Sequence, residues 1–191
     1  MARTPSSEAH EKVLSAAGAL IAERGVNGFS MDSVARSSGV SKATIYKHWP
    51  DKEALCLETA KRLAGVVPSF ESGNPRQDLI GLLQHLARRR KAPAWSRIWP
   101  SLMTYSINNP EFGRKLRRYI VEPQRVQLKQ ILEYAAKRGE LMPDLDTDFS
   151  LSLLAGPIFH CAMLKSEVSL RFIEHVVDSF WKAHMRISHV P

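Results

Sequence analysis

The sequence predicts an all-α protein made of a three-helix, helix-turn-helix head followed by a helical body. Apolar residues recur every three or four positions through most of its 191 residues, which is the period of a helix face. Capping residues and Gly or Pro stand at the ends of these segments, and no segment is a convincing strand.

The first helix is expected over residues 8–24. Apolar residues from Ala9 to Ile21 have helical spacing, and Gly25 follows the last turn. We expect residues 1–7 to form a disordered arm. Arg3 in this arm could enter a DNA minor groove, or the arm could simply be a frayed terminus.

A second helix is expected from Met31 to about Ser37. Ser30 is a good N-cap, and Phe29 with Val34 forms a hydrophobic staple across the helix start. Gly39 ends the helix, because glycine accepts the positive φ of a tight turn.

Two more capped helices follow at once. Ser41 caps a helix over residues 42–48, which Pro50 terminates, and Asp51 caps a helix from Lys52 to about Val67. A helix, a glycine turn and a second short helix form a helix-turn-helix, whose second helix enters the DNA major groove.

The helix over residues 42–48 has two different faces. Ile45 and Trp49 fall on one side, at about 100° per residue. The opposite arc carries small, basic, hydroxylic and aromatic side chains: Lys42, Ala43, Thr44, Tyr46 and Lys47. Such groups can bond bases or phosphates, although a solvated surface helix would have similar residues.

A domain boundary is expected at residues 68–75, a polar stretch broken by Pro and Gly. Residues 1–67 then form the helix-turn-helix DNA-binding domain with its connecting helix, and residues 76–191 form a second helical domain, to which the family resemblance given below assigns ligand binding and dimerisation. In the second domain we expect helices over residues 76–90 and 94–106. A longer helix follows, with Asn109 as its cap, an interruption near Pro123, and its end near Arg138.

The last two helices, over residues 146–165 and 169–185, have unusually apolar faces. Gly156 and Pro157 are expected to bend the first of them. A monomer could bury both helices, but a four-helix contact with a second copy explains the apolar surface better.

The net charge of +8 does not locate a DNA surface. Residues 1–65 carry a net +2, residues 66–140 a net +8, and residues 141–191 a net −2. The run Arg88 to Lys91 is most simply a solvated helix end, and the alternative is that these middle cations face DNA or an acidic ligand.

Cys56 and Cys161 show no metal-ligand or CxxC spacing, so we expect reduced, buried thiols. No apolar run reaches membrane-spanning length and residues 1–10 resemble no signal peptide, so a cytoplasmic protein without contact to the membrane is expected.

The sequence offers no catalytic, cofactor or metal site. No phosphate loop, GxSxG or HExxH pattern occurs, and the adjacent His160 and Cys161 point to different sides of a helix. An enzyme is therefore not expected. The alternatives to a DNA-binding regulator are a helical ligand-binding dimer without specific DNA binding and a purely structural helical dimer.

The stretch from Met31 to Leu55 resembles the DNA-binding module of TetR-type regulators, the family of the tetracycline repressor and AcrR. Its AxxxGVSxxTxYxHFxxKxxL pattern is matched by Ala35, Gly39, Val40, Ser41, Thr44, Tyr46, His48, Trp49, Lys52 and Leu55. Trp49 stands where Phe is commoner in that family, and Ser38 where a small apolar residue is usual.

The resemblance implies a role for each residue around the second helix of the motif. Ser41, Lys42 and Ala43 would read bases. Thr44, Tyr46 and His48 would hold the sugar-phosphate backbone, and Lys52 would present its charge and the start of its helix to a phosphate. With Lys47 from the helix face, these are the expected DNA-binding residues.

The tail resembles the dimerisation helices of a TetR subgroup. A GELxPDxD segment, from Gly139 to Asp146, precedes an LLAGP turn at Leu153 to Pro157. The resemblance implies a homodimer through residues 147–186, a palindromic double-stranded operator, and a ligand-responsive repressor released by an unknown small molecule. It places the ligand among the middle helices, where these large side chains could line a pocket or belong to the core: Trp95, Trp99, Met103, Tyr105, Phe112, Phe159, His160 and Met163.

Overall fold

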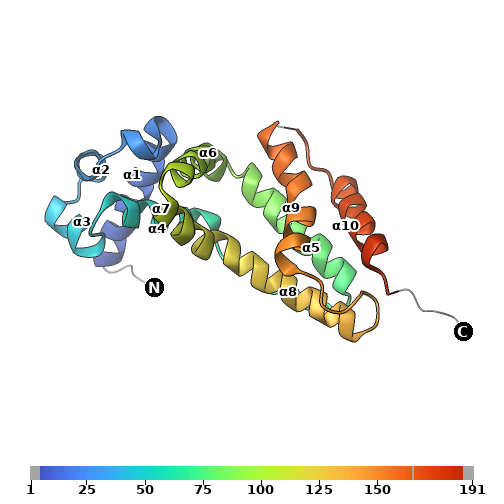
Figure 1. Ribbon diagram of the computed structural model, residues 1–191. Helices are drawn as coiled ribbons and strands as arrows, with labels where there is room; N and C mark the ends of the chain where they lie inside the picture. The colour runs from blue at the N-terminus through green and yellow to red at the C-terminus, as the bar shows by residue number, and fades with distance from the viewer. Residues whose placement is uncertain (1–4, 165, 187–191) are drawn as a thin grey trace, which may run out of the picture. The chain divides into compact units, whose positions relative to one another are not determined.

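The computed structural model describes residues 5–164 and 166–186, and Figure 1 shows its helices. The helices in chain order are α1 (Pro5–Gly28), α2 (Met31–Ser38), α3 (Lys42–His48), α4 (Lys52–Ala64), α5 (Pro75–Lys91), α6 (Pro93–Asn108), α7 (Pro110–Leu116), the π-helix η1 (Arg117–Val121), α8 (Glu122–Lys137), α9 (Thr147–Met163) and α10 (Leu170–His184). Within the described residues the only β-type pairing is an isolated bridge between Leu141 and Met185. The expected all-α fold is confirmed.

The helices pack as two compact units. The first contains the described part of residues 1–65 and residues 92–120, and the second contains residues 66–91 and the described part of 121–191. These packing units divide the chain at other positions than the expected domains, 1–67 and 76–191, because α6 packs against α1 and α4, and α7 against α4 and α6. The expected domain bounds themselves stay a prediction. The division of DNA-binding and ligand-binding roles between the two expected domains stays a prediction.

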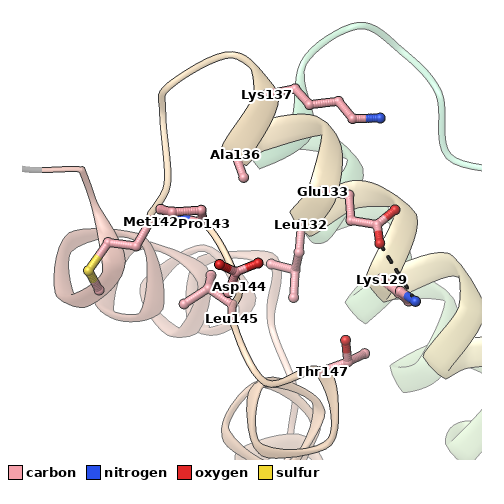
Figure 2. A pocket seen from close by; sticks show the side chains of 10 residues that line it. All are labelled: Lys129, Leu132, Glu133, Ala136, Lys137, Met142, Pro143, Asp144, Leu145 and Thr147. Carbon is pink, nitrogen blue, oxygen red and sulfur yellow. Dashed lines mark ion pairs between the residues drawn. The ribbon is translucent and has the colours of Figure 1, made fainter.

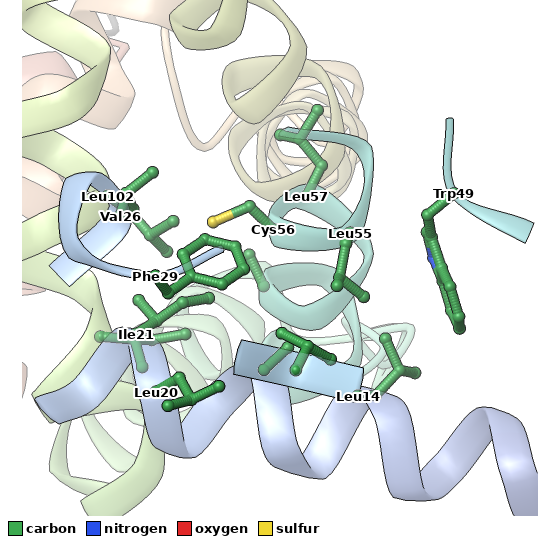
Figure 3. Close-up of a cluster of buried hydrophobic side chains, with 14 of the residues drawn as sticks. Leu14, Leu20, Ile21, Val26, Phe29, Trp49, Leu55, Cys56, Leu57 and Leu102 are labelled. Carbon is green, nitrogen blue, oxygen red and sulfur yellow. The ribbon is translucent and has the colours of Figure 1, made fainter. Parts of the chain in front are cut away.

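The first unit is built on α1, which packs against α2, α4 and α6. Figure 3 shows its core, in which Ile21 of α1, Phe29 before α2 and Leu55 of α4 come together. All three side chains are at most 2% exposed. Because α3 adds Ile45 to this same core, the short helix is anchored by the three longer ones.

The helix α1 is longer than expected at both ends. It begins at Pro5, so the expectation of a disordered arm over residues 1–7 is wrong for residues 5–7, and Arg3 lies outside the described residues. Gly25 interrupts the helical geometry with φ 71° and ψ 174°, and a last turn continues to Gly28. The following amide, of Val26, donates to Ser101 Oγ of α6 at 2.8 Å, which ties this break to α6.

Two details of the later helices differ from expectation. Helix α4 ends at Ala64 rather than near Val67, because Gly65 takes φ 69° and closes the last turn. Asn109 does not cap α7 with its side chain, which instead donates to the carbonyl of Tyr105 at 2.9 Å and so caps the end of α6.

The interruption expected near Pro123 is present as the π-helix η1. Proline has no N–H to donate to the carbonyl four residues earlier. The wider turns of η1 occupy the five residues up to Val121, and α8 then starts with Pro123 in its first turn.

The second unit packs α5 against α8, α9 and α10. Its core includes Leu79 and Leu83 of α5, Leu154 of α9 and Val177 of α10, each at most 1% exposed. Arg76 of α5 also forms a hydrogen-bonded ion pair with Asp178 of α10. No helix among the described residues is long and apolar enough to cross a membrane.

Candidate nucleic-acid interface

Helix α2 starts and ends as its sequence predicts. Ser30 Oγ accepts from the Ser33 amide at 3.2 Å, and Ser33 Oγ accepts from the Ser30 amide at 3.0 Å, which completes a capping box. Gly39 ends the helix in the left-handed region, with φ 69° and ψ 12°. The unusual residue Ser38 has a local role, since its hydroxyl accepts from the Val40 amide at 3.2 Å within the turn.

The two faces of α3 are confirmed. Ser41 Oγ accepts from the Thr44 amide at 3.2 Å and caps the helix. Ile45 and Trp49 are 0% and 2% exposed, so one side of α3 is held in the core. The residues expected at DNA on α3 and its cap are all exposed: Ser41, Lys42, Ala43, Thr44, Tyr46, Lys47 and His48.

The charges on this face are partly compensated inside the protein. Lys42 Nζ lies 2.7 Å from Asp32 Oδ1 of α2, and both side chains are more than half exposed. An exposed pair of this kind contributes little stability and can exchange its partner for a phosphate. The face therefore has the shape and chemistry of a groove-binding surface, while the DNA contacts themselves stay predictions.

The side chain of Lys52 does not point freely to solvent, as a phosphate contact would require. Its side chain is half-buried, with Nζ 3.4 Å from the Val26 carbonyl oxygen and 5.8 Å from the centre of the Tyr105 ring. The start of α4 is capped by Asp51, whose Oδ1 accepts from the Ala54 amide at 2.7 Å. A phosphate contact by Lys52 stays a prediction and requires the ammonium to leave these internal contacts.

The start of α4 is also bound to α6. Tyr105 donates its hydroxyl to Glu53 Oε1 at 2.7 Å, and this hydrogen bond, with burial, raises the pKa of Tyr105 to about 12. Next to it, burial raises the pKa of the Cys56 thiol to about 12, with Lys52 opposing the shift. Cys56 is buried as expected, whereas Cys161 is only half-buried.

Comparison with known proteins identifies the family of this arrangement. Residues 13–59 match the profile of the bacterial regulatory proteins of the tetR family, and residues 70–180 match the tetracyclin repressor-like C-terminal domain. The second match alone covers more than half of the chain. The chain belongs to the TetR family. TetR-family proteins are transcriptional regulators, which bind DNA and are not enzymes.

Curated relatives agree with this assignment, and a solved structure shares the fold. The HTH-type transcriptional regulator YdeS of Bacillus subtilis is 30% identical over 91% of this chain and 88% of its own length. The DNA-binding transcriptional repressor TetR of Mycobacteroides abscessus is 30% identical over 81% of this chain and 82% of its own. In fold, the chain is similar to the flavonoid-responsive regulator FrrA, with a TM-score of 0.73 at 24% identity, covering 94% of this chain and 98% of that one.

The side chains expected at a ligand are divided between the two units of this TetR-family chain. In the first unit Trp95 stacks on Trp99 with ring centres 5.0 Å apart, and Tyr105 meets Phe112 edge-on at 4.9 Å. Met103 is half-buried on the same helix, α6. Trp95 and Phe112 are at most 1% exposed and so belong to the core.

The remaining three, Phe159, His160 and Met163, lie on α9 of the second unit. His160 and Met163 are exposed, so the interpretation of His160 as a buried core histidine is wrong. The assignment of all eight residues to a ligand pocket stays a prediction.

A surface groove of about 580 Å³ lies in the second unit, between α8 and the segment over residues 142–147 (Figure 2). Lys129 and Glu133 form an ion pair at 3.7 Å on its α8 wall, and Met142, Pro143 and Leu145 line the facing segment. None of the expected ligand residues lines this groove.

The run Arg88 to Lys91 at the end of α5 is only in part the solvated helix end that the sequence suggested. Arg88 is exposed, but Arg89 is only 9% exposed and Arg90 is half-buried, with its guanidinium 4.9 Å from the centre of the Phe159 ring. Burial, with the charge of Arg90, lowers the pKa of Arg89 to about 10. Arg89 and Arg90 therefore take part in the packing of α5, whereas Arg88 lies on the helix surface.

Three acidic residues around α3 and α4 were not anticipated from the sequence: Asp32, which pairs with Lys42, Glu53, which holds Tyr105, and Glu58. Glu58 accepts from the indole N–H of Trp49 at 2.7 Å. The sequence did indicate that such an acceptor exists, because a buried tryptophan at position 49, where phenylalanine is usual, needs a hydrogen-bond acceptor for its indole N–H.

Proposed function

We propose that this TetR-family regulator is a repressor that binds a palindromic operator as a homodimer and is released by a small molecule. The observation that carries the DNA-binding step is the face of α3, where seven exposed residues surround the single buried anchor Ile45. Lysines, hydroxyls and a half-exposed tyrosine are groups that reach bases and phosphates in the major groove. The repressor role is supported by the Mycobacteroides abscessus relative, which is named as a repressor.

The dimer is supported by an apolar stripe on α9. Phe149, Leu153, Met163 and Leu164 are 59%, 42%, 62% and 64% exposed, and Leu170 at the start of α10 is 50% exposed. Phe149 and Leu153 are four residues apart on one side of α9, and Leu164 directly follows the last residue of the helix. An exposed stripe of this kind is typical of a subunit contact, and a two-fold dimer would present two α3 helices to two half-sites.

Release by a ligand is supported by the contacts of α6. This helix carries four of the expected ligand residues and also holds the DNA-binding helices, through Ser101 Oγ on the Val26 amide and Tyr105 on Glu53 of α4. A ligand that binds better to a shifted α6 would change the positions of α1 and α4, and with them that of α3. The likeness to FrrA supports a fold in which such control is possible.

The test of DNA binding is selection of duplexes from a random library by the purified protein near physiological salt, followed by affinity measurements on the enriched sequence. We expect an enriched palindrome, to which Tyr46→Ala and Lys47→Ala bind at least about tenfold more weakly. Tyr134→Ala and Lys137→Ala are the matched controls, because both residues are exposed on α8 of the other unit. Equal weakening by the control variants would contradict the assignment of the α3 face.

A protein that enriches no sequence, and whose residual binding only fades with salt, would instead be a ligand-binding dimer without specific DNA binding. The dimer has a separate test by light scattering after size-exclusion chromatography. Leu153→Asp should give a monomer, whereas Ile107→Asp, at a 77% exposed position on α6, should not. A dimer that survives Leu153→Asp would place the subunit contact elsewhere.

A further inference from the structure

Trp49, directly after α3, is buried yet polar. Its ring is 2% exposed, and its indole N–H donates to Glu58 Oε2 of α4 at 2.7 Å. A buried indole N–H needs an acceptor, and a carboxylate makes a stronger one than a neutral group. The end of α3 is therefore fixed by a charge-assisted hydrogen bond in addition to apolar packing.

The second oxygen of the same carboxylate holds a third helix. Glu58 Oε1 lies 2.8 Å from Nε2 of His10 on α1, so the imidazole donates from this nitrogen. The ring of His10 in turn lies against Trp49, with ring centres 4.6 Å apart. One carboxylate thus joins α1, α4 and the end of α3.

His48 connects this cluster to the expected DNA surface. Its ring centre lies 5.8 Å from that of His10, edge-on, and 5.6 Å from that of Trp49. His48 itself is exposed and is one of the residues expected at the phosphate backbone. The three rings therefore run from the Glu58 carboxylate to the surface that α3 presents.

Packing around these rings is incomplete on one side. A small recess of about 30 Å³ lies beside them, lined by His10, Val40, Ile45 and Trp49 among others. Atoms that line such a space lack van der Waals contacts on that side, so packing restrains the rings less there. The hydrogen bonds to Glu58 are directional and add a restraint that packing does not supply on that side.

We propose that Glu58 is a positioning residue for DNA reading, which holds Trp49 and His10 and through them sets the orientation of α3 and His48 at the operator. The role rests on the proposed function, since it requires that α3 reads duplex DNA. Glu58 does not touch DNA; it acts by reducing the range of orientations that α3 samples before binding. A phenylalanine at position 49 would keep an aromatic ring in the core, but it has no N–H to donate to Glu58.

The test compares Glu58→Gln and Trp49→Phe with Glu23→Gln, an exposed position on α1. Glu23→Gln changes the net charge as Glu58→Gln does, so it corrects for the general gain in attraction to DNA. The probes are the duplex enriched by the wild-type protein and a scrambled duplex of the same length. We expect Glu58→Gln and Trp49→Phe to bind the enriched duplex about tenfold more weakly than the control, with less than about twofold change on the scrambled duplex.

Two further measurements separate positioning from general stability. With ¹⁵N-labelled tryptophan, the indole signal that is lost in Trp49→Phe should move upfield in Glu58→Gln, as expected for a weaker hydrogen bond. The double variant should lose less affinity for the enriched duplex than the sum of the two single losses, because both changes remove the same indole hydrogen bond. Any further loss beyond that of Trp49→Phe reports the contact of Glu58 with His10.

Several results would overturn the proposal. An indole signal that stays in place in Glu58→Gln would show that the hydrogen bond is not made in solution. Unchanged affinity despite a moved signal would show that the bond does not position α3, and a joint loss of both duplexes with a lowered melting temperature would show a purely structural role. If the wild type enriches no duplex, the proposed function itself fails and the positioning role with it, whereas the indole signals still report the contact.

Discussion

The burial of Ile45 makes the stability of α3 a measurable quantity. This helix has seven residues, too few to be stable alone, and Ile45 is its only buried side chain. Ile45→Ala removes three carbons from a site that is 0% exposed. At about 0.8 kcal/mol per buried carbon, plus a cavity contribution, the free energy of unfolding should fall by about 3 kcal/mol.

The assay is urea unfolding followed by far-UV circular dichroism. Ile45→Val, which removes one carbon, should cost about 1 kcal/mol, and the series should therefore scale with the carbons lost. Val66→Ala, at an 88% exposed position, is the matched surface control and should change the free energy by less than about 0.5 kcal/mol. A loss of under about 1 kcal/mol in Ile45→Ala would refute the argument that α3 depends on this anchor.

Three other predictions follow from the described contacts. Gly39→Ala should lower the free energy of unfolding by about 1 kcal/mol through backbone strain alone, because Gly39 has φ 69° and no neighbouring atom within 4 Å of an added Cβ; unchanged urea unfolding would refute this. Because the Glu53 hydrogen bond raises the pKa of Tyr105 from 10 to about 12, its stabilisation should be complete below pH 10 and lost as the pH rises toward 12. Tyr105→Phe should therefore show a smaller loss of stability than the wild type over this range in urea titrations, and identical pH profiles would contradict the pairing. In thiol titration at pH 8, buried Cys56, whose pKa is raised to about 12, should stay unreactive until unfolding, while half-buried Cys161 reacts, and Cys161→Ser should leave the folded protein without reaction.

The DNA-binding head was predictable because its signals are local. The caps at Ser30, Ser41 and Asp51 act within three residues of themselves, and Gly39 sets its own backbone angle. The side of α3 that is buried follows from the helix period alone, and Ile45 confirms it. Such features depend little on what the rest of the chain does.

The features that the sequence did not predict depend on how the folded chain packs. Asn109 has a typical capping side chain, but the carbonyl of Tyr105 was the acceptor within its reach. Arg89 is a charged residue at a helix end, yet the packing of α5 buries it. Glu58 meets His10 across 48 positions, and no local pattern encodes such a pair.

The single buried anchor of α3 also has an evolutionary consequence. Apart from the cap Ser41, the positions from Lys42 to His48 other than Ile45 face outward, so most substitutions there cost the fold little. Under the proposed function, these positions can therefore change by mutation and give the protein a preference for another operator, while the rest of the protein stays constant. Within the helix, selection for folding then acts mainly on Ile45, and selection for the choice of operator acts on the exposed residues.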